Sequence, residues 1–81
     1  MQAERVEQVR QAAERYLPDM TRFLRDLIAI PSESCEEEGV VRRTIAEMER
    51  LGFDEALIDP QGNAIGYMGT GERIIAFDGH I

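Results

Sequence analysis

The chain has 81 residues, enough for one small domain, and 16 acidic against 9 basic residues give it a formal net charge of -7. This acidic balance argues against a nucleic-acid or anionic-membrane surface, because both need a basic patch. No apolar run approaches the roughly 20 residues of a membrane span, and the polar start is unlike a signal peptide. The one cysteine, Cys35, cannot form an internal disulfide, which predicts a cytoplasmic location.

The first 30 positions show apolar residues at helical spacing. Residues 3–17 are predicted to form a helix with one apolar side, made of Val6, Val9, Ala13, Tyr16 and Leu17. Pro18 then predicts a kink or a fresh helix start, because proline suits only the first turn of a helix. Residues 19–30 continue with a wider apolar stripe, made of Met20, Phe23, Leu24, Leu27 and Ile28. Pro31 ends this segment, since it disfavours helical dihedrals at the residue before it.

A further helix is predicted over residues 36–51. Its inward side is expected to consist of Val40, Val41, Ile45, Met48 and Leu51. Three glutamates occupy its first turn, where the helix dipole favours carboxylates. Gly52 has the place of a C′ residue, so the chain should turn there and let Phe53 fold back on the last turn.

Three strands joined by tight turns are predicted in the last third of the chain. Residues 56–58 and 63–68 form the first two, and residues 59–62 form the β-turn between them. Residues 69–72 turn the chain into a last strand over residues 74–77, whose unbroken apolar run indicates burial on both faces. The order of elements predicts an α/β fold with two or three helices followed by a three-stranded antiparallel β-meander.

The predicted last strand needs neighbouring strands and covering helices that the rest of this chain does not supply. A strand buried on both faces needs neighbours at both edges, whereas two amphipathic helices can cover only one face of a sheet. The sequence is therefore expected to be the opening of a larger α/β domain.

His80, the single histidine, follows that strand directly after Asp78 and Gly79. A lone histidine beside an apolar strand is more often structural or exposed than a ligand. Its place at the carboxyl end of a buried strand nevertheless favours a ligand role, since open α/β sheets bind ligands there. Neutral imidazole is a common metal ligand, and Gly79 leaves room for something to approach. No motif in the chain completes a metal site by itself.

The sequence from Phe77 to Ile81, after a helix, helix and hairpin and an Asp59-Pro60-Gln61-Gly62-Asn63 turn, resembles a known family. It is similar to the start of the ArgE/DapE/aminoacylase family of dinuclear zinc peptidases and amidohydrolases, and most similar to the subgroup of selenium-metabolism hydrolases. The Ile30-Pro31-Ser32 sequence after the second helical segment also resembles the opening of that family. The resemblance covers residues 16–81.

The resemblance implies that residues 1–81 are the N-terminal part of a zinc-exopeptidase-like catalytic domain. It implies that His80 is a ligand of one of two metal ions, zinc, with cobalt or manganese as alternatives. The complete enzyme would use a metal-activated water to cleave an amide or peptide bond of a small substrate, and would be a homodimer. Because this chain supplies one ligand and no general base, it is itself expected to be inactive.

Two other functions are compatible with the sequence. The chain could be a small acidic α/β interaction module without catalysis, or a fragment that self-associates through unpaired strand edges. Cys35 is expected to be incidental, because its acidic neighbours raise a thiol pKa and disfavour the thiolate. The three glycines Gly66, Gly69 and Gly71 precede a strand rather than a helix, so they indicate turns and not a phosphate loop.

Overall fold

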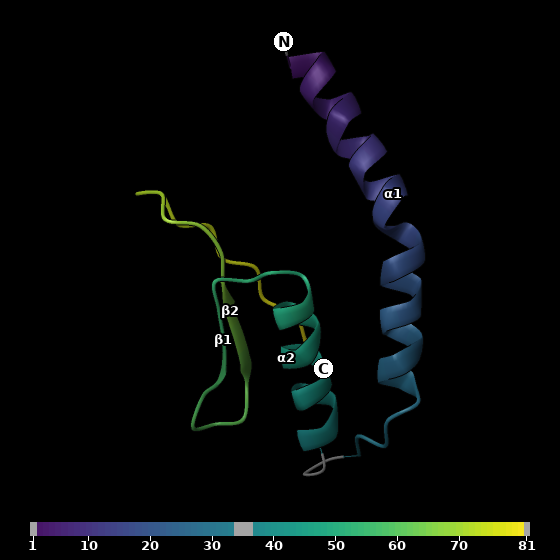
Figure 1. The fold of residues 1–81 in the computed structure, drawn as a ribbon, viewed down its shortest axis with the longest axis vertical. Coiled ribbons are helices and arrows are strands. Elements are labelled where there is room, and N and C mark those ends of the chain that lie inside the picture. Colours follow the sequence, from purple (N-terminus) through teal and green to yellow (C-terminus); the bar gives the residue numbers. More distant parts are fainter. Residues whose placement is uncertain (1, 34–36, 81) are drawn as a thin grey trace.

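A computed structural model describes residues 2–33 and 37–80. Its elements are, in chain order, α1 (Gln2–Ile28), α2 (Glu38–Arg50), β1 (Glu55–Ile58) and β2 (Ala64–Tyr67). Helix α2 lies between the β1–β2 hairpin on one side and α1 on the other (Figure 1). The described residues thus form a small α/β structure with two helices and a two-stranded antiparallel sheet. None of its helices is both long enough and apolar enough to cross a bilayer.

Helix α1 is one helix and not two, so the predicted fresh start at Pro18 is wrong. Pro18 lies inside it, and Figure 1 shows the helix bending about midway along its length. This agrees with the predicted kink, because proline has no N–H to donate and its ring presses on the preceding turn. The helix ends at Ile28, and the amide of Ile30 still donates to the carbonyl of Leu27.

Helix α2 ends as its sequence predicts. Gly52 has a φ of 86°, its amide donates to Glu49, and the amide of Phe53 donates to Met48. These two hydrogen bonds form a Schellman motif, which needs a residue that accepts the left-handed conformation. The predicted start at residue 36 falls outside the described residues, and the helix as described begins at Glu38.

The apolar core of the described chain is centred on α2. Val40 and Val41 are its buried apolar residues, at 2% and 5% exposure, and Ile45 and Met48 are half-buried. Leu51, expected to face inward, is half exposed because the chain turns away at the Schellman motif. On α1, Phe23 and Leu27 are half-buried, whereas the rest of the predicted stripe faces solvent.

The hairpin follows the sequence closely. β1 and β2 pair antiparallel, with Glu55 opposite Tyr67 and Ile58 opposite Ala64. The connecting turn closes through the amide of Gly62, which donates to the carbonyl of Asp59 and has a φ of 91°. Both strands pack on α2, which covers one face of the sheet.

The predicted third strand is wrong for this structure. Residues 73–80 have no regular structure, and the side chains of Ile74 and Phe77 are 90% and 95% exposed. The physical reason is the need for neighbours, since a sheet-centre strand requires hydrogen bonds at both edges and cover on both faces. Helix α2 already packs on the hairpin, and no second layer is present among the described residues. The three-stranded meander is therefore a two-stranded hairpin.

Candidate functional site

His80 lies in the irregular segment after the hairpin and is exposed to solvent. Its side chain borders a shallow hollow of about 250 Å³ between the two helices. The other residues that line this hollow are mainly apolar: Leu24, Leu27, Ile28, Ser32 and Val40. An imidazole at the rim of an apolar hollow can bind a metal or donate a hydrogen bond, but the hollow itself offers no second metal ligand.

The described residues do not assemble a metal site. Across residues 2–33 and 37–80, no group of three or more His, Cys, Asp or Glu side chains is placed to hold an ion. Structural and catalytic zinc sites need at least three protein ligands. The described residues alone therefore do not provide a complete ligand set for the implied pair of metal ions, and the role of His80 as a ligand stays a prediction. Cys35 lies outside the described residues.

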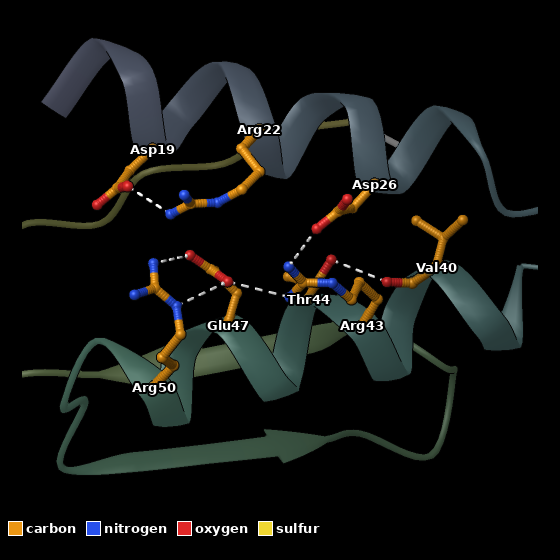
Figure 2. Close-up of polar contacts among 8 residues, drawn as sticks. All are labelled: Asp19, Arg22, Asp26, Val40, Arg43, Thr44, Glu47 and Arg50. Carbon is orange, nitrogen blue, oxygen red and sulfur yellow. Dashed lines mark hydrogen bonds and ion pairs between the residues drawn. The ribbon is translucent and has the colours of Figure 1, made fainter.

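A network of ion pairs joins the two helices and was not foreseen from the sequence (Figure 2). Arg43 on α2 donates to Asp26 on α1 at 2.8 Å and to Glu47 on its own helix at 3.0 Å. Its guanidinium also lies 5.0 Å from the ring centre of Phe23, within the range of a cation–π contact. Arg43 therefore holds α1 against α2 through both charge and ring contacts.

Glu47 is the buried member of this network, at 7% exposure. Arg50 donates to both of its oxygens, and Arg43 donates to Oε1, the oxygen that also accepts from Nε of Arg50. These guanidinium groups, Arg50 first, lower the pKa of the Glu47 carboxyl to about 2. Because its oxygens are occupied by arginines of the same helix, we assign Glu47 a structural role rather than an acid–base role. The spacings of three and four residues are the sequence signal that could have found these two contacts.

A second hollow, of about 330 Å³, lies between the start of α2 and the hairpin turn. Its most constrained polar group is Asp59, whose carboxylate accepts hydrogen bonds from the amides of Gln61 and Asn63, both at 2.9 Å. The amide of Asn63, and then its side chain, lower the pKa of Asp59. The carboxylate is thus engaged by its own turn, in agreement with the β-turn predicted at residues 59–62.

Comparisons with known proteins connect the chain to a hydrolase. It is 59% identical over 69 residues to the uncharacterized protein YgeY of Escherichia coli, which covers 85% of this chain and 17% of YgeY. It is 40% identical over 59 residues to the [LysW]-lysine hydrolase of Deinococcus radiodurans, covering 73% of this chain and 16% of that protein. The chain is homologous to part of both proteins.

The chain spans about a sixth of the length of these curated relatives. No protein-family model matches it, and no solved structure matches it. The predicted resemblance is therefore supported at the coarser level, as partial homology to a hydrolase that covers most of this chain. The metal, the substrate and the role of His80 belong to the proposal that follows.

Proposed function

We propose that this chain is the N-terminal part of the catalytic domain of a metal-dependent hydrolase that cleaves an amide or peptide bond of a small substrate. The observation that carries the proposal is the 40% identity over 59 residues to [LysW]-lysine hydrolase. The small share of that protein that is matched supports placing the activity in a longer protein that contains these residues. The complete protein is proposed to be a cytoplasmic homodimer.

His80 is the residue of this chain proposed to take part in the site, as one ligand of two zinc ions, with cobalt or manganese as alternatives. A metal-bound imidazole needs an accessible ring nitrogen, and His80 is exposed. When bound, such ions supply an acidified water for attack on a carbonyl group. The remaining ligands and the general base are proposed to lie outside this chain.

The experiment compares the 81-residue chain with the complete protein encoded by the same gene. Both are incubated with zinc, cobalt or manganese and with a panel of N-acyl amino acids and dipeptides. We expect hydrolysis by the complete protein alone, lost after chelation and restored by metal. His80→Ala should reduce both bound metal and turnover, whereas Glu72→Ala, a change in the same exposed segment, should reduce neither.

Three results would contradict this proposal. Turnover that persists after chelation would remove the metal from the mechanism, and full metal content in the His80→Ala protein would remove the ligand role of His80. Hydrolysis by the 81-residue chain itself would show that the activity does not need a longer protein.

A second candidate is a small acidic interaction module without catalysis. The observation that favours it is the exposed apolar run at residues 74–77, where Ile74 and Phe77 are almost fully accessible, since such surfaces often mark interaction sites. A complete protein that binds no metal and hydrolyses none of the panel would favour this candidate over the hydrolase.

A further inference from the structure

The N-terminal half of α1 extends away from the rest of the molecule (Figure 1). Its apolar side chains face solvent, with Val6 67% and Val9 69% exposed and Tyr16 and Met20 more than half exposed. Isolated helices of about 12–15 residues are marginal in water, because most helical stability in proteins comes from packing of an apolar face. This part of α1 therefore has an apolar face and no covering element among the described residues.

The apolar face of α1 has the spacing of a coiled coil. Intervals of three and four residues alternate along it without exception, through Val6, Val9, Ala13, Tyr16, Met20, Phe23 and Leu27. These are the a and d positions of a heptad repeat, which packs best against another helix. Pro18 falls at the f position, on the outer side. We call the first five of these residues the free seam, since Phe23 and Leu27 are half-buried at the α2 end.

The charges along the free seam also favour self-association. Residues 2–20 contain four acidic residues and three arginines, so this segment carries a formal charge of only -1 although the whole chain carries -7. Arg10, at an e position beside the seam, is bound by Glu7 and Glu14 of its own helix. Two copies of this segment can therefore approach with little of the repulsion that the rest of the acidic chain would cause.

We propose that residues 2–20 of α1 form an antiparallel two-stranded coiled coil with the same segment of a second copy of this chain. The register that leaves Phe23 and Leu27 on α2 places Val6 against Tyr16 of the second copy and Val9 against Ala13 of the second copy. This contact is isologous, as a twofold dimer requires. The proposal does not depend on the proposed hydrolase function.

Charge at the e and g positions favours the antiparallel orientation. In that register Arg5 of each copy lies opposite Asp19 of the other, which gives two attractive pairs, although Asp19 is also bound by Arg22 of its own helix. The two Arg10 side chains, each bound by glutamates of its own helix, face each other as one repulsive pair. A parallel pairing would instead place Arg5 beside Arg10 of the second copy, where both side chains are cationic. Antiparallel packing also brings the opposite ends of the two helix dipoles together.

The first experiment measures the association of the 81-residue chain by sedimentation equilibrium, together with its helicity by circular dichroism. We expect a monomer–dimer equilibrium in which helicity rises with protein concentration. Val9→Asp should weaken the dimer by about a hundredfold or more, because it places a carboxylate in the seam. The control Gln8→Asp adds the same group on the outer side one residue away, and should change the dissociation constant by less than about threefold.

The second experiment fixes the orientation with two single-cysteine chains in a Cys35→Ser background. Val9→Cys and Ala13→Cys chains are mixed and oxidised, and the products are separated by mass. The antiparallel register predicts mixed disulfides between positions 9 and 13, whereas a parallel register predicts disulfides between identical chains.

Three outcomes overturn the proposal. These are a monomer whose helicity does not change with concentration, a dimer that Val9→Asp leaves intact, and cross-linking between identical chains only. The second outcome would assign the contact to another surface, such as the strand edges or residues 74–77.

Discussion

At the scale of single residues, Glu47 makes the folded chain sensitive to acid. Its pKa is lowered from 4.5 to about 2 by Arg50 and Arg43. The folded state therefore keeps the carboxylate charged at pH values where the unfolded chain takes up a proton. The resulting stabilisation is fully present above pH 4.5 and is lost as the pH falls from 4.5 to about 2.

This loss of stability at low pH gives a direct prediction for Glu47→Gln, which keeps the shape of the side chain and removes its titration. The variant should melt below the wild type at pH 7, and the difference should shrink as the pH falls through this window. Circular dichroism melts at several pH values measure the effect. Glu49→Gln, at an exposed position on the same helix, should leave the melting temperature nearly unchanged. A difference in melting temperature between wild type and Glu47→Gln that stays the same at all pH values would contradict the structural role assigned to the charged Glu47.

A glycine is needed at position 66 because neighbouring side chains leave no room for a Cβ atom, and not because its backbone conformation requires one. A methyl group on its Cα would lie 2.6 Å from the Phe53 ring and 2.8 Å from the sulfur of Met48. Overpacking of this kind costs about 1–3 kcal/mol, so we expect Gly66→Ala to lower the free energy of unfolding by that amount. Denaturant titration measures it.

The matched control for Gly66→Ala is Gly71→Ala. A methyl group at Gly71 meets nothing within 4 Å, so the change should alter stability by less than about 0.5 kcal/mol. Equal effects of the two substitutions would show that the packing of β2 on α2 is not as tight as described.

Local residue chemistry was predictable from the sequence, whereas contacts between distant residues were not. Gly52 and the turn at Asp59 follow from rules that span four or five residues, and both predictions are confirmed. The bond between Asp26 and Arg43 joins positions 17 apart, and nothing in the sequence separates it from many other possible pairs. The metal role of His80 depends on partners that no local rule can locate, and it stays a prediction.

At the scale of elements, residues 74–77 contribute almost nothing to the fold of this chain. An apolar run of this composition predicts a buried strand only if a sheet receives it, and here α2 already packs on the hairpin. The helices and the hairpin were predictable because each satisfies its backbone hydrogen bonds internally. The last strand was not, because its partners must come from other segments.

The burial of α2 residues and the exposure of residues 74–77 predict different effects of substitutions on stability. Val41→Ala should lower the free energy of unfolding by about 2 kcal/mol, because Val41 is buried and loses two methyl groups with partial relaxation around the cavity. Phe77→Ser should change it by less than about 0.5 kcal/mol, since Phe77 is almost fully exposed. Thermal and urea unfolding measure both changes. A large loss for Phe77→Ser would place this ring in a packed environment in solution.

At the scale of the whole molecule, the chain is more open than a compact domain of its size. Its accessible surface is 7395 Å², against about 4,900 Å² for a compact monomer of 9.2 kDa. Its radius of gyration is 15.0 Å, against about 11.7 Å for a compact chain of 81 residues. The extended half of α1 and the irregular segment after the hairpin account for the difference in shape (Figure 1).

This open shape predicts an unusually small heat-capacity change on unfolding. The fully extended chain exposes about 13,000 Å², so folding as described buries about 45% of that surface, roughly 70% of what a compact domain would bury. A compact domain of this length has a heat-capacity change of about 1.1 kcal/mol/K, and we expect about 0.8 kcal/mol/K here. Calorimetry on the Val9→Asp chain, in which the free seam cannot pair, measures the isolated monomer. A value near that of a compact domain would mean that residues 74–77 or the free half of α1 pack onto the core in solution, which would remove the surface that both interaction proposals require.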